Sequence, residues 1–405
     1  MDRSDVIILG GGLVGLTLAA ALGRHEITSV VVDPADPAAT LVAGFDGRAS
    51  AVASASWRML EAIGIGARLR GQGCPIRTIR ASDGLSPRAL VFDAAPADDP
   101  LGIMFENRAL RAALRAEAQA SPAVTLLAPA RPVATRRDAS GVEVTLADGR
   151  TLRGALLIAA EGRNSPTREA AGIAVARWRY DHAAIIATLG HGAPHDRIAH
   201  EIFYPSGPFA LLPMLDDERG PRSAIVWTVA ARDASAMLGL PDRAFLAEAE
   251  KRMGPLLGPL RSVSPRSSYP LGFHHAAVIT GERLALIGDA AHGIHPIAGQ
   301  GLNLGFRDVA ALTEVLVEGA RLGLDPGDAQ LLGRYQRWRA LDTLLVAAAT
   351  DGLTRLFGVS GRAPRAIRRF GLALVERVPP LKRAFMAEAR GESGELPRLL
   401  QGLEV

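Results

Sequence analysis

The stretch VIILGGGLVG, residues 6–15, sets the interpretation of the chain. Its first four residues predict a buried strand, the glycines a tight turn, and the apolar residues up to Leu22 a helix. In this context Gly10 permits the turn, Gly12 lets the backbone approach a pyrophosphate, and Gly15 lets the helix pack against the strand. The helix start then offers N–H groups and a partial positive charge to phosphates. The stretch therefore predicts a dinucleotide site.

A carboxylate at the end of the next strand supports this prediction. The apolar run 29–32 ends at Asp33, eighteen residues after Gly15. A carboxylate at about this spacing accepts hydrogen bonds from a ribose hydroxyl and disfavours a 2′-phosphate. We therefore expect FAD or NAD rather than NADP, the alternative being a glycine-rich turn of another α/β fold.

A second polar and glycine-rich turn, GDAAHGIHPIAGQGLN, occupies residues 288–303 after the apolar run 284–287. Asp289 can accept from a ribityl or ribose hydroxyl. Backbone N–H groups around 299–302 can meet a flavin ring or a phosphate where a helix opens near Asn303. Two such turns at opposite ends of the chain would converge on one extended ligand, and FAD is such a ligand.

The composition is that of a globular protein. The chain has 405 residues, of which 48% are hydrophobic and 22% charged, so we expect two lobes or more. The net charge of +4 permits contact with an acidic membrane without requiring it. The single cysteine, Cys74, excludes an internal disulfide and fits a reducing compartment, and we interpret it as a structural residue in a turn. No uncharged apolar run is long enough to predict a membrane-spanning helix.

The remaining patterns predict an α/β fold: a Rossmann-like FAD-binding domain with an inserted antiparallel β-sheet substrate domain and a helical C-terminal region. Helical spacing covers residues 48–63 and 106–120, a hairpin 142–152, and strands 155–159, 182–188, 223–228 and 283–287. We expect the FAD-binding domain to comprise residues 1–72, 101–180 and 270–345. The substrate domain would comprise 73–100 and 181–269, and the C-terminal helical region 346–405.

These motifs carry a resemblance to a known family. The two glycine turns are similar to those of the single-component FAD-dependent aromatic hydroxylases, and Glu161-Gly162-x-x-Ser165-x-x-Arg168 resembles the family's Asp-Gly motif. Four further stretches, 45–51, 203–213, 269–273 and 295–308, resemble the ubiquinone-biosynthesis hydroxylases, and the likeness covers roughly residues 4–345. The departure is Glu161, where the family usually has Asp, and it weakens any role of this carboxylate in docking NAD(P)H.

The resemblance implies FAD, reduced by NAD(P)H or another donor, which reacts with O2 to form a C4a-hydroperoxyflavin. This species would hydroxylate the aromatic ring of a polyprenylated ubiquinone precursor. The implied residues beside the reactive flavin edge are Pro296, Gly299, Gln300 and Gly301. The expected cofactor contacts are Gly10, Gly12, Gly15, Asp33, Arg48, Arg108, Glu161, Gly162, Gly288, Asp289, Gly301, Leu302 and Asn303.

For several side chains the sequence allows both a functional and a structural role. His292 and His295 lack a third ligand, so we expect no metal, and packing is favoured over a role as general base. Arg307 and Asp308 are interpreted as structural residues of the following helix. The aromatic side chains Phe203, Phe209 and Trp227 either line a substrate channel or fill the core of the second lobe.

The sequence also allows two other functions. One is a hydroxylase of the same fold that acts on another aromatic compound, and another is a non-catalytic flavin-binding subunit of a biosynthetic complex. The basic, apolar tail 353–390 either lies on an acidic membrane surface, or is a solvated helical cap on the FAD domain, or is a surface that binds partners such as other ubiquinone-biosynthesis proteins. We expect a cytoplasmic protein, with peripheral contact at the inner face of the cytoplasmic membrane as the variant, and no nucleic-acid partner.

Overall fold

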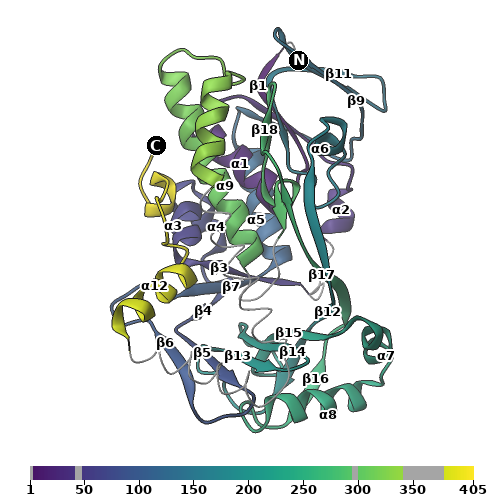
Figure 1. Ribbon diagram of the computed structural model, residues 1–405, viewed down its shortest axis with the longest axis vertical. Helices are drawn as coiled ribbons and strands as arrows, with labels where there is room; N and C mark the ends of the chain where they lie inside the picture. Colours follow the sequence, from purple (N-terminus) through teal and green to yellow (C-terminus); the bar gives the residue numbers. More distant parts are fainter. Residues whose placement is uncertain (1–2, 42–47, 294–299, 341–377) are drawn as a thin grey trace.

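The computed structural model describes residues 3–41, 48–293, 300–340 and 378–405. Figure 1 shows two lobes: an upper one of strands flanked by helices and a lower one built on a broad sheet. The predicted α/β architecture, with an inserted and mainly antiparallel sheet and a helical C-terminal region, is confirmed.

The upper lobe is built on an eight-stranded sheet whose main path runs β18-β19-β11-β1-β2-β8. The strands are β18 (Thr280–Gly281), β19 (Leu284–Leu286), β11 (Thr151–Ala159), β1 (Ser4–Leu9), β2 (Ser29–Val32) and β8 (Val124–Leu127). Off this path, β10 (Gly141–Leu146) pairs with β11, and β9 (Pro132–Asp138) pairs with β10. The pairs between β19 and β8 are all parallel. The carboxyl ends of β1 and β19, only one strand apart, therefore meet at the same edge of the sheet.

Helices cover this sheet because its strands are apolar on both faces. They are α1 (Leu13–Gly23), α5 (Asn107–Ala120) and α9 (Gln300–Arg321), with the shorter α2 (Pro37–Thr40), α4 (Ile65–Leu69) and α6 (Pro166–Ala170). The α9 helix opens at Gln300, three residues earlier than expected.

The prediction of one helix over residues 48–63 is wrong for the first part of this segment. Residues Ala49–Ala53 form β3, and α3 (Ser54–Ala62) follows. Strand β3 pairs with β7 (Gly102–Glu106), which also pairs with β4 (Gly73–Ile76), so these three make a separate small sheet. Cys74 therefore lies in a strand rather than a turn; it is buried, and burial raises its pKa to about 11.

The lower lobe is a nine-stranded sheet with the main order β20-β17-β12-β15-β14-β13-β5-β6. Its strands are β5 (Thr78–Asp83), β6 (Ala89–Asp93), β12 (Val175–His191), β13 (Ile198–Tyr204), β14 (Gly207–Pro213), β15 (Arg222–Ala230), β16 (Leu260–Val263), β17 (Ser267–Ala276) and β20 (His292–Gly293). Helices α7 (Ala234–Leu238) and α8 (Asp242–Met253) lie beside this sheet (Figure 1). Phe209 and Trp227 pack with Phe245 of α8, so these two aromatic residues fill the core of the lobe.

Two long strands join the lobes. Strand β12 spans 17 residues and, with β17, runs from the lower sheet up beside the first sheet (Figure 1). At its upper end β17 pairs with β20, where His275 lies opposite His292. The second glycine-rich turn is thereby attached to both sheets.

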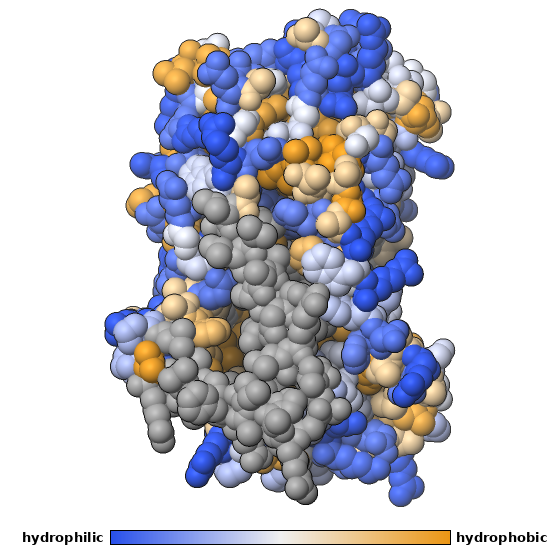
Figure 2. Space-filling model, in the orientation of Figure 1, coloured by the Kyte–Doolittle hydropathy of each residue, from blue (hydrophilic) through white to orange (hydrophobic). Residues whose placement is uncertain are grey.

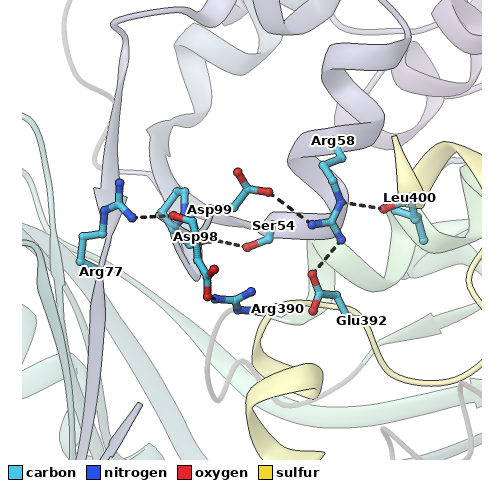
Figure 3. Close-up of polar contacts among 9 residues, drawn as sticks. Ser54, Arg58, Arg77, Asp98, Asp99, Arg390, Glu392 and Leu400 are labelled. Atoms are coloured by element: carbon cyan, nitrogen blue, oxygen red, sulfur yellow. Dashed lines mark hydrogen bonds and ion pairs between the residues drawn. The ribbon is translucent and has the colours of Figure 1, made fainter. Parts of the chain in front are cut away.

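The C-terminal segment returns to the upper lobe through α12 (Pro379–Ala389) and the short 3-10 helix η4 (Arg398–Gln401). Figure 3 shows Arg58 of α3 at the centre of this contact: its Nη2 lies 2.8 Å from Glu392 Oε1, and its Nε donates to the carbonyl of Leu400. Arg390 pairs with Asp98 at 3.2 Å. Most of the basic tail 353–390 lies outside the described residues.

The surface drawn in Figure 2 is mostly hydrophilic, with apolar residues in separate small patches. The most exposed large apolar side chains lie far apart in the sequence and include Leu85, Val133, Leu322 and Leu403. In the described part of the chain, no helix combines the length and the apolar character needed to cross a bilayer.

Candidate FAD site

The glycine loop after β1 has the geometry that its sequence predicts. Gly10 has φ +109°, and a Cβ there would lie 2.3 Å from the carbonyl oxygen of Ala160. A Cβ on Gly15 would lie 2.0 Å from the carbonyl oxygen of Gly10, so helix α1 can pass this close only with glycine. A Cβ on Gly12 would meet nothing within 4 Å. Gly12 thus borders open space at the start of α1, and no side chain caps that end of the helix.

Asp33 holds the glycine loop from the end of β2. Its Oδ2 accepts a hydrogen bond from Gly11 N at 2.5 Å, and its Oδ1 accepts from Ala35 N at 2.7 Å. A cavity of about 150 Å³ opens beside it. The cavity is lined by Gly11, Gly12, Leu16, Val31, Asp33, Ala35, Pro37, Arg111, Arg115, Leu126 and Ala128. Glycine backbone, one carboxylate and two arginines on a mostly apolar wall fit the adenosine and phosphate end of a dinucleotide.

The second glycine turn meets the first in space. Gly288 adopts φ +58°, a left-handed conformation, and a Cβ there would lie 3.2 Å from Cγ2 of Val14, the second residue of α1. Gly305 of α9 lies against the same side chain of Val14 and against the Cα of Gly288. Residues almost three hundred positions apart are therefore in contact, as the convergence of the two turns on one ligand requires.

Asp289 follows directly and is exposed on this side. Burial by the surrounding residues nevertheless raises the pKa of Asp289, and the positive charge of Arg163 opposes this effect. Its backbone carbonyl accepts from His274 Nε2 at 2.7 Å. Since a carbonyl only accepts, that ring nitrogen carries the proton, and burial lowers the pKa of His274 to about 4. Gly293 makes room for this ring, because a Cβ there would lie 2.2 Å from it.

A buried ion cluster anchors the turn from behind. Asp308 of α9 accepts a hydrogen bond from Gly288 N at 2.9 Å and another from Arg339 Nε at 2.7 Å. His292 Nε2 lies 2.7 Å from Asp308 Oδ2. Burial alone would raise the pKa of Asp308, but His292 and Arg339 outweigh it and hold the pKa below its ordinary value. Asp308 is thus an ionised anchor for the backbone that carries Asp289, and His292 belongs to this packing.

The carboxylate of Glu161 makes hydrogen bonds within its own motif. Glu161 Oε2 accepts from Ser165 Oγ at 2.6 Å and from Thr167 N at 3.2 Å, so the carboxylate caps the start of α6. Arg168 is fully buried and donates to the carbonyls of Ala290 and Arg163, which ties α6 to the second glycine turn. Gly162, with φ +81°, has open space where a side chain would be. The longer acid is thereby accommodated in a structural role.

The remaining residues predicted to contact the cofactor differ in where they lie and in what they bind. Asn303 uses its amide on the small sheet, donating to Ala51 O and accepting from Ala53 N, both at 2.9 Å. Arg48 is exposed just before β3. The Nε of Arg108 is buried and makes no hydrogen bond to any described residue, which leaves it a donor for an anionic ligand. Gly301 and Leu302 lie in the first turn of α9, whereas Pro296 and Gly299, the side chain of Gln300, and also His295, lie outside the described residues.

Sequence reasoning missed three contributors to this region. Arg111 and Arg115 line the cavity one and two helical turns beyond Arg108, where the repeating arginines of α5 were the available signal. Arg163 acts electrostatically on Asp289, His274 and Tyr269 together, and only the folded structure brings these three near it. Burial raises the pKa of Tyr269 to about 12, against the influence of Arg163. Within the described residues, no three His, Cys, Asp or Glu side chains form a metal-binding group.

Known proteins share this arrangement. Residues 3–345 match the family model described as FAD binding domain. The chain belongs to this family. Its described residues fit the cofactor: a glycine cradle, an uncapped helix start, a ribose-competent acid and an unpartnered buried arginine nitrogen. FAD is therefore the cofactor.

Similar proteins of the family include enzymes of ubiquinone synthesis. The chain is 49% identical over 404 residues to ubiquinone hydroxylase UbiL of Rhodospirillum rubrum, covering 99% of this chain and 93% of that protein. It is 34% identical over 396 residues to 3-demethoxyubiquinol 3-hydroxylase of Escherichia coli, covering 96% and 98%. Among solved structures, p-nitrophenol 4-monooxygenase PnpA of Pseudomonas putida superposes with a TM-score of 0.78 at 18% identity, covering 98% of this chain and all of that one, which shows a shared fold.

Proposed function

We propose that the protein is an FAD-dependent monooxygenase that hydroxylates the aromatic ring of a polyprenylated ubiquinone precursor. The observation that carries the proposal is the contact between the two glycine turns, at Gly288 and Val14, which builds one continuous site for an extended flavin dinucleotide. The 49% identity to a ubiquinone hydroxylase over 99% of the chain supports the choice of substrate.

The described residues would divide the work of holding the cofactor. The glycine loop and α1 would bind the pyrophosphate through backbone N–H groups, and Asp33 would accept from the ribose. Asp289 would accept from a hydroxyl of the ribityl chain, while Arg108, with its unpartnered Nε, would balance phosphate charge. Glu161 and Gly162 would border the cofactor cleft, with Arg48 at its rim.

The bound cofactor supplies the oxygen chemistry, and the protein orients the ring and excludes water. The residues proposed to lie beside the reacting atoms are Pro296, Gly299, Gln300 and Gly301, of which Gln300 and Gly301 open α9. Backbone N–H groups there would stabilise developing negative charge. NAD(P)H is the proposed electron donor, and O2 the oxidant.

We further propose that the protein acts from the cytoplasm and reaches its polyprenylated substrate at the inner face of the membrane, through its basic C-terminal region or through other ubiquinone-biosynthesis proteins. The many arginines of residues 353–390 support this proposal. Flotation with vesicles of anionic and of neutral lipids, comparing the full chain with a variant in which Arg365, Arg368 and Arg369 are replaced by glutamine, tests it. Equal flotation of both chains would remove the membrane contact.

The decisive experiment supplies the FAD-loaded protein with NAD(P)H, O2 and a polyprenylated phenol and identifies products by mass. We expect a product heavier by one oxygen atom, labelled when the reaction uses labelled O2. Expression in bacteria that lack individual ring hydroxylases, with quinone intermediates identified by mass, then assigns the ring position. Failure to restore any hydroxylation, with FAD fully bound, would instead favour a flavin-binding subunit without turnover.

A further inference from the structure

Helix α8 covers one face of the nine-stranded sheet. A row of side chains on the opposite face points away from α8. The row crosses five strands through the paired residues Ser267, Ile186, Val226, Ala210 and Glu201. Directly paired residues of adjacent strands point to the same face, and chain neighbours point to opposite faces. The chain neighbours of this row, Ile185, Trp227, Phe209 and Ile202, lie in the core against α8. The row therefore faces away from that core.

The space in front of this row is bounded on two sides. On one side, the residues two positions from the row on their strands are Ala199, Leu212 and Ala224. They pack with Met104 and Cys74 of the small sheet. Since β3 of that small sheet is bound by Asn303 at the start of α9, this contact joins the sheet face to the flavin-binding region.

In the other direction, Tyr269 lies opposite Ala184 and is within the electrostatic reach of Arg163, which also acts on Asp289. Between these two boundaries, Ile186 and Val226 stay partly exposed although their strands lie in the middle of the sheet. These partly exposed apolar side chains leave a surface in the middle of the sheet that an apolar substrate can cover.

Glu201 is the ionisable residue of this otherwise small or apolar row. It makes no hydrogen bond or ion pair with any described residue, and burial raises its pKa from 4.5 to about 7. The other titratable or charged side chains of this face are Asp83 of β5, Tyr269 of β17, His182 of β12 and Arg222 of β15, the last paired with Glu106 at 2.9 Å. Arg80 and His200 form a pair on the opposite face. A carboxyl without a partner on an apolar wall is costly unless a ligand uses it.

We propose that Glu201 is the acid–base residue of this face of the sheet, where its carboxylate accepts the proton of the ring hydroxyl of a phenolic substrate. The O–H bond of the phenol breaks, its electron pair stays on the ring oxygen, and a new O–H bond forms on Glu201. The electron-rich ring carbon is then a better nucleophile for the oxygen derived from O2. Glu201 returns the proton to the ring oxygen of the product, while the proton displaced from the ring carbon leaves to solvent. This inference rests on the proposed function.

The test compares Glu201→Gln, which keeps size and polarity but does not titrate, with Glu218→Gln, an exposed carboxylate of the same lobe. The probe is 2-geranylphenol, bound to the oxidised FAD-loaded protein between pH 5 and 9 and followed by the ultraviolet difference between phenol and phenolate. In the wild type and in Glu218→Gln we expect phenolate to form at higher pH on the protein than in solution, because the ionised Glu201 disfavours a second negative charge beside it. In Glu201→Gln this displacement should vanish, with full FAD content retained.

Turnover gives the second readout. General acid–base catalysis contributes about 10²- to 10⁴-fold, so hydroxylation by Glu201→Gln should fall by about 10²-fold or more, while Glu201→Asp keeps a pH-dependent rate. A phenol titration and a rate equal to those of the wild type in Glu201→Gln would overturn the inference and leave the proposed function standing. A wild type that hydroxylates no phenol, yet loses its phenol titration on substitution, would overturn the function and leave the role of Glu201 standing.

Discussion

The buried carboxyl of Glu201 makes a quantitative prediction about stability, independent of catalysis. Its pKa is about 7 in the folded protein against an ordinary value of 4.5, because burial disfavours the charged form. The folded state therefore binds more protons than the unfolded chain between these two values, and stability falls as the pH rises through that window. At ~1.36 kcal/mol per pH unit the loss by pH 8 approaches about 3 kcal/mol, an upper value because Glu201 keeps some contact with solvent.

Glu201→Gln removes this titration, so it should be more stable than the wild type at pH 8 by up to about 3 kcal/mol and by less than about 1 kcal/mol at pH 5. With an unfolding entropy of about 0.85 kcal/mol/K for a chain of this length, the gain at pH 8 corresponds to roughly 3 °C in Tm. Thermal denaturation of the FAD-loaded proteins at several pH values measures it, with Glu218→Gln as the control. A Tm difference between Glu201→Gln and wild type that does not change with pH would refute the assignment of a raised pKa.

Three further substitutions test the flavin region. In Gly12→Ala the new methyl group meets open space in the protein, so the Tm of the apoprotein should stay within about 1 °C of the wild type. The Kd for FAD, measured by flavin fluorescence, should rise about tenfold or more. An unchanged affinity would contradict phosphate binding at this loop. Gly15→Ala forces a Cβ to 2.0 Å from the Gly10 carbonyl, so it should lower the Tm of the apoprotein itself, and a wild-type Tm would show that the helix can shift. Asp308→Asn leaves Arg339 and His292 without their buried anion and should cost about 3–5 kcal/mol in urea denaturation; a loss below about 1 kcal/mol would show that the cluster is not the anchor described.

Much of the FAD region could be predicted because its signals are local. The strand, turn and helix of residues 4–23 are encoded within a few consecutive residues, and Gly10 and Gly15 occupy positions where the backbone excludes a Cβ. The second turn was recognisable for the same reason, since Gly288 with its positive φ directly follows a buried strand.

Features that depend on distant partners could not be predicted. Residues 49–53 have helical spacing but form β3, because β7 and the amide of Asn303 satisfy its backbone groups. Glu201 carries no sequence signal, since only the register of five strands shows which way it points. Asp308 was interpreted as part of the helix start, and its real partners, Gly288 N and Arg339, are twenty and thirty-one residues away.

The order of the strands in the first sheet has a consequence for synthesis of the protein on the ribosome. Strands β1, β2, β8 and β11 are complete once residue 159 has been made, but β19 and α9 join them only after another 125 residues and more. A nascent chain therefore displays the first glycine loop long before the backbone around Gly288 can close against Val14. Cofactor loading should therefore be a late event that waits for synthesis of β19 and α9, and premature termination anywhere before α9 should yield a colourless fragment.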